Sequence, residues 1–233
     1  NLATAEALGT LPEQLVGRAL GDFLAATSRS EYENYLKRLA QQQQDEGTLL
    51  VRRADSGERL WRYSSRLSET RGYAIGHAVD ITEQAREAEA LRAENLRDAL
   101  TQAYNRRYLP LFESRLAERS WAVINVDLDQ FKLINDTQGH DAGDQVLIAM
   151  TAYLQQQVRE ADAVVRSGGD EFVLLLADAD EGRVHGLLAR LRAGMDQAPC
   201  RYSTGHAVRQ RGEHLTDTLA RADAEMYSLR RAA

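Results

Sequence analysis

Ala163-Val-Val-Arg-Ser-Gly-Gly-Asp-Glu-Phe-Val-Leu-Leu-Leu176 decides the fold of the second half of this chain. The apolar runs on either side of the glycine pair predict two strands joined by a hairpin. Gly168 and Gly169 suit backbone angles that other residues resist, and they let a ligand approach the main chain closely. Asp170 and Glu171 follow where the second strand begins. The plainer alternative is a tight turn with solvated acidic residues.

A second acidic group follows Trp121-Ala-Val-Ile-Asn-Val-Asp127, which has the pattern of a buried strand. Asp127 closes this strand. A carboxylate at a strand end, close to another on a hairpin, is an arrangement that suits Mg²⁺, because this ion prefers oxygen ligands together with substrate phosphates. Asp129 comes two residues later, and we expect it to cap the helix that starts there rather than to bind metal.

Three further polar residues indicate a nucleotide. Lys132 is by default a solvated helix residue, yet it lies about one turn from the expected phosphate position. Asn135 and Asp144 match the donors and acceptors of a guanine edge: the amide serves the carbonyl or N7 of the base, and the carboxylate accepts from N1–H and N2–H₂. These residues therefore predict a guanine-nucleotide site beside the metal.

The segments around these residues predict an α/β fold in the second half. Their patterns indicate strands at 121–127, 163–166, 172–176 and 201–208 and helices at 106–119, 143–157, 182–194 and 216–231. Upstream, a small antiparallel sheet with helices ahead of it is predicted, with strands at 47–53, 59–67 and 73–80 and turns at 55–58 and 71–72.

The segment between these parts is rich in Glu, Ala, Arg and Leu, and it predicts a helix up to Leu100. A weak heptad runs along it through Ile81, Gln84, Ala88, Leu91, Asn95 and Asp98. A solvated connector is one interpretation. We favour a parallel two-stranded coiled coil that joins two copies of the chain.

Composition narrows the class of protein. The 233 residues carry a net charge of -6, which argues against a protein that binds nucleic acid through its overall field. No stretch approaches the roughly 18 apolar residues that a membrane span needs. Cys200 is the one cysteine, so no internal disulfide forms, and a buried filler is favoured over a nucleophile. We expect a cytoplasmic protein; the absence of a starting methionine suggests further sequence upstream, such as a membrane anchor or another sensor.

Residues 98–233 resemble the GGDEF domain of the diguanylate cyclase family over essentially its full length. The matching stretches are Asp98-Ala-Leu-Thr101, Asn105-Arg106-Arg107, Asp127-Leu-Asp-Gln-Phe-Lys-Leu-Ile-Asn-Asp136, Gly139-His140, Gly143-Asp144, Arg166-Ser-Gly-Gly-Asp-Glu-Phe172 and Ala222-Asp-Ala-Glu-Met-Tyr227. The resemblance implies a nucleotidyl-cyclase-like, palm-like α/β sandwich. It also implies that two GTP condense to cyclic di-GMP and two pyrophosphates.

The family's roles transfer to matching positions. By this resemblance Asp127, Asp170 and the carbonyl of Leu128 bind Mg²⁺, with Mn²⁺ as an alternative, while Glu171 assists metal binding or deprotonation of the ribose 3′-hydroxyl. The implied substrate-binding residues are Lys132, Asn135, Asp144, Gly168, Gly169 and Arg230. Each domain holds one GTP, so the resemblance implies a homodimer.

A third motif, Arg159-Glu-Ala-Asp162, lies five residues before the glycine pair and matches the family's inhibitory product site, with Arg190 as a further contact. The alternative is an exposed Arg159–Asp162 ion pair, which contributes little in water. Two stretches depart from the family. Gln102-Ala103 replaces Gly-Leu, where we expect only a local packing change. The tail Leu229-Arg-Arg-Ala-Ala233 lacks part of the family's basic pattern, and we expect it to bind the triphosphate more weakly.

Residues 1–80 resemble a PAS sensor domain that lacks its usual first strand. The motifs are Ala7-Leu8-Gly9, Leu15-Val-Gly17-Arg18 and Gly76-His-Ala-Val-Asp-Ile-Thr-Glu83. No cofactor is predicted there, because the flavin-linking cysteine is absent and His77 is expected to pack in a strand rather than to bind haem. The expected organisation is therefore a PAS domain at 1–80, a signalling helix at 81–97 and a GGDEF domain at 98–233.

The sequence thus predicts a dimeric, PAS-regulated diguanylate cyclase with product inhibition. The main alternative is a catalytically silent module that binds GTP or cyclic di-GMP. A PAS scaffold with an inert output domain is a third, which the intact acidic residues disfavour.

Overall fold

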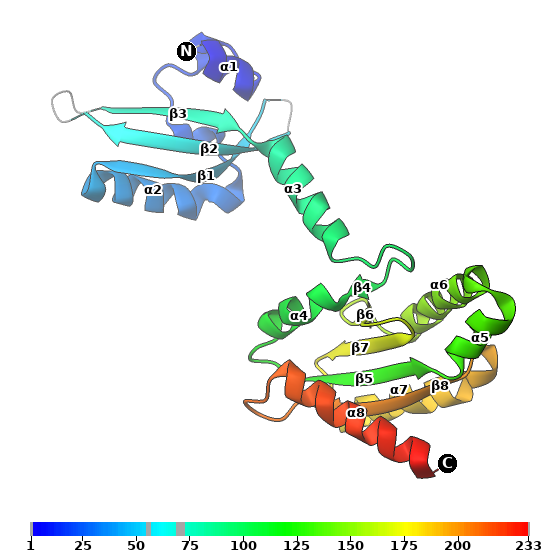
Figure 1. Cartoon of the computed structure of the whole chain (residues 1–233). Coiled ribbons are helices and arrows are strands. Elements are labelled where there is room, and N and C mark those ends of the chain that lie inside the picture. The colour runs from blue at the N-terminus through cyan, green and yellow to red at the C-terminus, as the bar shows by residue number, and fades with distance from the viewer. Residues whose placement is uncertain (1, 55–56, 69–72, 233) are drawn as a thin grey trace. The chain divides into compact units, whose positions relative to one another are not determined.

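The computed structural model describes residues 2–54, 57–68 and 73–232, and the chain divides into two compact units, Asn1–Arg92 and Ala93–Ala233 (Figure 1). Each unit has its own sheet and its own hydrophobic core. No helix within the described ranges is both long and apolar enough to cross a membrane.

The first unit consists of short helices followed by a three-stranded antiparallel sheet of order β1-β2-β3. Its helices are α1 (Leu2–Leu8) and α2 (Arg29–Gln42), with 3₁₀ turns between them, and its strands are β1 (Gln44–Arg52), β2 (Glu58–Leu67) and β3 (Ala74–Asp80). The predicted small sheet with helices ahead of it is confirmed. The turns predicted at 55–58 and 71–72 fall wholly or partly outside the described residues.

The core of the first unit lies on one face of its sheet. Apolar side chains of α2, represented by Tyr35 and Leu39, pack on Leu49, Val51 and Trp61 of the first two strands. The side chains of β3 are all exposed. This sheet is therefore covered mainly over β1 and β2.

Helix α3 (Thr82–Asn95) ends earlier than the sequence predicts. The Asn105 side-chain amide donates to the main-chain carbonyls of Asn95 (2.8 Å) and Arg97 (2.9 Å). Asp98 then begins a turn, because its Oδ1 accepts from the main-chain N–H of Thr101 at 2.9 Å. The predicted helix through Leu100 is therefore wrong, because these side chains form the hydrogen bonds of the backbone in place of further helical turns. The last heptad position, Asp98, lies beyond the end of α3.

The second unit is built on a five-stranded sheet of order β4-β6-β7-β5-β8. The strands are β4 (Tyr104–Asn105), β5 (Trp121–Leu128), β6 (Ala163–Arg166), β7 (Glu171–Ala177) and β8 (Tyr202–Val208). All neighbouring pairs are antiparallel except β4 with β6. The predicted palm-like α/β fold is confirmed.

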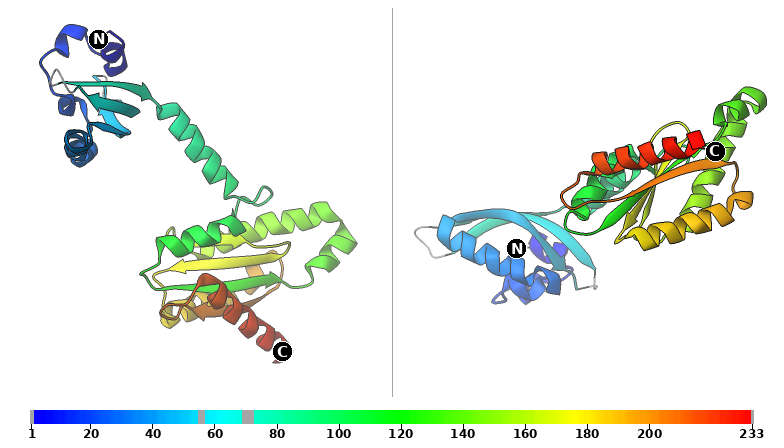
Figure 2. Two further views of the ribbon diagram at one scale, coloured as in Figure 1. Left: turned by 60° about the vertical axis from the view of Figure 1, so that its left-hand side comes forward. Right: turned by 90° about the horizontal axis from the view of Figure 1, so that it is seen from below.

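Helices cover both faces of this sheet (Figure 2). They are α4 (Leu109–Arg115), α5 (Phe131–Gln138), α6 (His140–Gln157), α7 (Glu181–Ala193) and α8 (Leu215–Ala232). The helix predicted at 106–119 is a 3₁₀ turn followed by a shorter α4, and α6 begins at His140 rather than Gly143.

The apolar residues of β5 and β7 alternate between two cores. On β5, Ile124 and Val126 pack with α6 and α7, whereas Val123 points to the core shared with α4 and α8. Because both faces are buried, the strands are continuous apolar runs in the sequence. This sheet fixes the ends of β5 and β7, where the acidic residues lie.

Helix α8 lies very close to β8 at Gly205. A side chain at this position would place its Cβ 2.5 Å from the main-chain nitrogen of Met226 and against the carbonyl of Ala222. Glycine is therefore required for the close approach of helix and strand.

Candidate active site

The acidic residues singled out in the sequence meet at one end of the sheet. Asp127, near the end of β5, lies opposite Glu171, the first residue of β7. The main-chain N–H of Leu128 donates to the carbonyl of Asp170 at 3.2 Å. The strand end and the hairpin are thus joined by backbone hydrogen bonds, and the structure brings the three predicted acids together.

A large open cleft lies at this end of the sheet, with a volume of about 1130 Å³. It is lined by acids and cations from several elements, among them Asp127, Asp170, Lys132, Arg192, Arg201 and Arg230. Glu171 lines a separate, smaller pocket that also touches Asp127. The combination of paired carboxylates with surrounding cations suits a metal-bound polyphosphate.

Arg230 links α8 to the acids. Its guanidinium donates to Asp127 and, at 3.3 Å, to Asp129, and the hydrogen bond to Asp127 raises the pKa of Arg230 above its ordinary value. The predicted phosphate-binding arginine therefore lies on the predicted metal-binding aspartate in this structure.

Asp129 does not cap a helix, so that expectation is wrong. Its carboxylate accepts from Ser203 Oγ at 2.7 Å as well as from Arg230. The N-cap of α5 is Gln130, which has a φ of 57° and makes no side-chain capping bond. Asp129 lines the cleft instead, beside Asp127.

Asn135 and Asp144, the predicted guanine contacts, come from two packed helices. Asn135 lies on α5 with its Oδ1 against the backbone of Gly143 in the first turn of α6, where a Cβ would collide with it. Asp144 is the next residue. The glycine thus lets Asn135 lie beside the turn that carries Asp144, although neither residue lines the main cleft.

The glycine pair provides space rather than unusual backbone angles. Neither Gly168 nor Gly169 has a positive φ, so that part of the prediction is wrong. A Cβ at Gly168 would lie 2.9 Å from Glu171 Oε2, whereas Gly169 has nothing within 4 Å of that position. Gly169 is therefore open to a ligand, whereas Gly168 makes room for the side chain of Glu171, which folds back over the turn.

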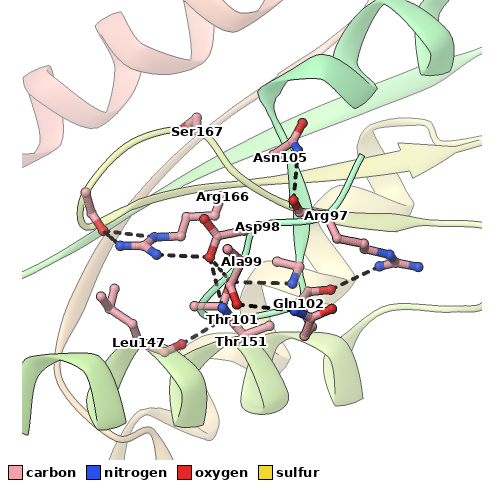
Figure 3. A network of polar contacts seen from close by, with 12 residues as sticks. Arg97, Asp98, Ala99, Thr101, Gln102, Asn105, Leu147, Thr151, Arg166 and Ser167 are labelled. Atoms are coloured by element: carbon pink, nitrogen blue, oxygen red, sulfur yellow. Dashed lines mark hydrogen bonds and ion pairs between the residues drawn. The ribbon is translucent and has the colours of Figure 1, made fainter. Parts of the chain in front are cut away.

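A polar network ties this turn to the start of the unit (Figure 3). Arg166 donates to the carbonyl of Gly169 from Nε (3.1 Å) and Nη2 (2.7 Å) and to Asp98 Oδ1 from Nη1 (3.0 Å). Burial opposes ionisation of Asp98, but its hydrogen bonds with Thr101 and Arg166 prevail, and the pKa of this carboxyl is lowered. One arginine thus connects the segment after α3 with the acidic turn.

The predicted product site is arranged differently from its motif. The Asp162 side chain is 1% exposed and pairs with Arg183 at 2.6 Å. It also accepts from the main-chain N–H of Arg159 (2.9 Å) and Ala177 (3.1 Å). An exposed Arg159–Asp162 ion pair is therefore wrong, since the aspartate is buried and contacts Arg159 through its backbone.

The two arginines of that site are exposed. Arg190 Nε donates to Gln157 Oε1 at 3.3 Å, and its Nη2 donates to the Gln157 carbonyl. Arg159 follows two residues after Gln157. Two guanidinium groups are thus available on this surface, while the acceptor positions of Asp162 are occupied.

Two other candidates behave as ordinary side chains. Cys200 packs against the core on the edge of the main cleft, and burial raises the pKa of its thiol to about 11, which disfavours a thiolate nucleophile. His77 lies on β3 with its side chain exposed, so its expected packing within a strand is not seen.

Some residues of the cleft were not predicted. Arg201 and Ser203 reach it from the start of β8, and Arg192 from α7. Their strand and helix patterns are ordinary. The antiparallel pairing of Asp127 with Ser203 brings the start of β8 to the acids, whereas Arg192 reaches the cleft from the end of α7. A pairing of distant strands is not visible in a local pattern.

The oxygen-rich end of the cleft fits a divalent cation. Asp127 and Asp170 both line it, and Asp127 pairs with the guanidinium of Arg230. Two carboxylates with room for phosphate oxygens and water are the set that Mg²⁺ or Mn²⁺ uses.

A five-stranded sheet covered on both faces, with paired acids where two antiparallel strands meet, defines a palm-type nucleotidyl-cyclase domain. The family model described as "Diguanylate cyclase, GGDEF domain" matches residues 95–233, and the chain belongs to this family. Residues 1–86 match the model described as "PAS fold". Both resemblances expected from the sequence are confirmed.

Curated relatives match mainly the second unit. Diguanylate cyclase DosC of Escherichia coli K12 is 34% identical over 126 residues, which cover 52% of this chain and 27% of DosC. The chain thus spans about a quarter of the length of that relative. Two solved structures are similar. One is the coiled coil and GGDEF domain of DgcB from Caulobacter crescentus in complex with c-di-GMP, with a TM-score of 0.59 and 26% identity over 65% of this chain and 89% of that one. The other is diguanylate cyclase SiaD in complex with its activator SiaC from Pseudomonas aeruginosa, with a TM-score of 0.56 and 30% identity over 65% of this chain and 64% of that one.

Proposed function

We propose that this protein is a diguanylate cyclase that condenses two GTP into cyclic di-GMP and two pyrophosphates. The observation that carries the proposal is the meeting of Asp127 with the Asp170–Glu171 turn beside a cleft lined by cations. Family membership supports the same reaction. Because GTP is a cytoplasmic nucleotide, we infer that the domain works in the cytoplasm.

Asp127, Asp170 and the carbonyl of Leu128 would hold Mg²⁺, with Mn²⁺ as the alternative. The ion supplies charge neutralisation on the α-phosphate and the leaving pyrophosphate. Glu171 folds back beside Gly168 at the mouth of the acidic turn. From there it accepts the proton of the ribose 3′-hydroxyl or assists in holding the metal.

The substrate is oriented by side chains from three helices. Asn135 and Asp144 contact the guanine edge, Lys132 contacts phosphate, and the open backbone at Gly169 allows close approach of the nucleotide. Arg230 rests on Asp127 and Asp129 in this structure. We expect it to turn to the terminal phosphates when the metal and GTP bind, because the cation then neutralises Asp127.

The reaction needs two domains. A single cleft positions one GTP, and the 3′-hydroxyl of that nucleotide must attack the α-phosphorus of another. Nearly all side chains of α3 are exposed, Leu91 at 65%, so the residues that the structure describes leave this helix largely uncovered. We propose that α3 pairs with its copy as a coiled coil, with the PAS domain contributing to the dimer, an arrangement that the coiled coil of DgcB supports.

The test is turnover of GTP with Mg²⁺ by the full chain, followed by chromatography for cyclic di-GMP. Asp170→Ala is expected to lower turnover at least about 1000-fold while leaving the fold intact, because the metal loses a ligand without a core residue changing. Cys200→Ser, a change on the same cleft, is the matched control. The silent-module alternative predicts no product from the unaltered protein; activity retained in Asp170→Ala would contradict the metal assignment.

We also propose that cyclic di-GMP inhibits the enzyme by binding at Arg159 and Arg190. Both guanidinium groups are exposed and can contact the guanine bases and phosphates of the product. Arg159→Ala should relieve inhibition by added cyclic di-GMP without lowering initial turnover; unchanged inhibition would contradict it. Because Asp162 is buried against Arg183, Asp162→Asn is expected to lower stability. It should lower product affinity only indirectly, because Asp162 accepts from the main-chain N–H of Arg159.

The PAS unit is proposed to regulate this output through α3. The segment after α3 reaches the acidic turn through Asp98 and Arg166, so a change at the helix end acts on the site. A bound PAS cofactor is not part of the proposal.

A further inference from the structure

Three side chains on the second unit form a group separate from the acidic cleft. Glu181 and His185 lie on α7, and His206 lies on β8. One ligand atom from each lies within 4.8 Å of the other two. None of the three lines the cleft that holds Asp127 and Asp170.

The local geometry directs these groups to one point. Glu181 and His185 are four residues apart, so they share one face of α7. The rings of His185 and His206 have centroids 5.4 Å apart and planes inclined by 71°. His206 Nε2 lies 3.8 Å from Glu181 Oε2, which is too long for a hydrogen bond.

Glu225 on α8 sets the orientation of His206. Its Oε2 lies 2.7 Å from His206 Nδ1 and also accepts from the main-chain N–H of that residue. A neutral imidazole that donates from Nδ1 presents a free lone pair at Nε2. A carboxylate behind the histidine in this way is the usual outer support of a metal-binding imidazole.

We propose that Glu181, His185 and His206 bind a divalent transition-metal ion, with Zn²⁺ as the best match. Two imidazoles and one carboxylate are a ligand set that Zn²⁺ accepts with a water in the fourth position. Imidazole ligands disfavour Mg²⁺, which prefers oxygen. The ligand atoms need to approach by only about 1 Å, since tetrahedral bonds of about 2.0–2.2 Å place ligands roughly 3.5 Å apart.

The surroundings permit such an ion. Glu181 and His185 are exposed and can adjust, whereas the side chain of His206 is 17% exposed and held by Glu225. Glu181 also interacts electrostatically with Arg221. A bound metal ion would take the place of Arg221 as the main positive charge near Glu181. A bound metal would join α7 to the edge strand, and Glu225 would extend that link to α8.

The test is a Zn²⁺ titration of the metal-free full chain in excess Mg²⁺, in competition with a chromogenic chelator. One Zn²⁺ per chain is expected. His185→Ala removes an exposed ligand, so it should keep the fold and weaken Zn²⁺ binding at least about 100-fold. Glu225→Gln should weaken it about 10–100-fold, the typical effect of an outer-shell change.

His214→Ala and Cys200→Ser are the matched controls, because they remove other possible ligands, and neither should change the affinity. Co²⁺ should give the visible absorption of a four-coordinate site in the unaltered protein and lose it in His185→Ala. Circular dichroism checks the fold of each variant. Equal Zn²⁺ affinity in His185→Ala and the unaltered protein, or binding lost in Cys200→Ser instead, would overturn the proposal. These readouts do not depend on cyclase activity.

Discussion

The two sheets of this protein differ in how they are covered. In the second unit, Ile124 on β5 is 0% exposed, and helices pack on both faces of the strand. In the first unit, Ile75 on β3 is 62% exposed. Both residues lie within antiparallel strands of the same chain, yet only one strand is part of a two-sided core.

The difference accounts for where the chemistry lies. A strand buried on both faces is fixed by packing, so the acids at its end keep their positions without a ligand. The sheet of the first unit is packed mainly on one side, and its β3 surface remains open. The first unit thus keeps one strand exposed, whereas the second holds the acids of the site by packing.

The largest expected effect contrasts the two isoleucines directly. Ile124→Ala should lower the free energy of unfolding of the second unit by about 3–4 kcal/mol, because a fully buried side chain leaves a cavity. Ile75→Ala should change that of the first unit by no more than about 0.5 kcal/mol. Hydrogen exchange of peptides from each unit in denaturant measures both values. Equal losses in the two units would show that the contrast in burial has no energetic counterpart.

Each unit also contains a carboxylate held by arginine: Asp45 by Arg38 and Glu213 by Arg221. The hydrogen bond from Arg221 lowers the pKa of Glu213 to about 2 from an ordinary value of 4.5. The folded-state pKa is depressed, so the stabilisation is present above about pH 4.5 and lost as the pH falls toward 2.

Glu213→Gln should therefore cost about 2 kcal/mol at pH 7, a value reduced from the full shift because Arg221 is 41% exposed. The difference from the unaltered protein should shrink between pH 4.5 and 2. The measurement is denaturant unfolding across this range. Asp45→Asn is the equivalent in the first unit, since hydrogen bonds with Arg38 lower the pKa of Asp45 as well. A constant difference at every pH would contradict the assignment.

The smallest expected effect concerns two glutamines with left-handed backbones, Gln43 at φ 62° and Gln102 at φ 60°. Gln102 occupies the place where the family has glycine, so the expected packing change is accompanied by backbone strain. Gln102→Gly and Gln43→Gly should each raise the stability of their own unit by up to about 1 kcal/mol. Calorimetry of both variants measures this, and a loss of stability in either would show that its side chain outweighs the strain.

Much of the second unit follows from its sequence, because strands buried on both faces leave long apolar runs. The run from Trp121 to Asp127 predicts β5 to within one residue. Helix ends are predicted less well. Leu100 continues the pattern of α3, but Asn105 caps that helix from β4 and ends it at Asn95. Such a cap depends on a tertiary contact.

The site shows the same division. The positions of Asp127, Asp170 and Glu171 follow from local patterns, since each lies at a strand terminus. The partners of those acids do not: Arg230 and Ser203 lie far along the chain and reach Asp127 and Asp129 only through the packing of α8 and β8. The group of Glu181, His185 and His206 was not predicted either, because it forms only when α7 packs beside β8.

Gly205 has no functional group, yet it sets the distance between α8 and β8, and with it the positions of Glu225 and Arg230. Helix α8 rests on β8 with backbone against backbone at this point, and the helix carries Glu225 and Arg230 one and two turns beyond Ala222. A single methyl group at position 205 would lift the helix away from the strand. Glu225 would then lose the imidazole of His206, and Arg230 would lose Asp127 and Asp129. One missing side chain therefore sets the spacing of two distant polar groups.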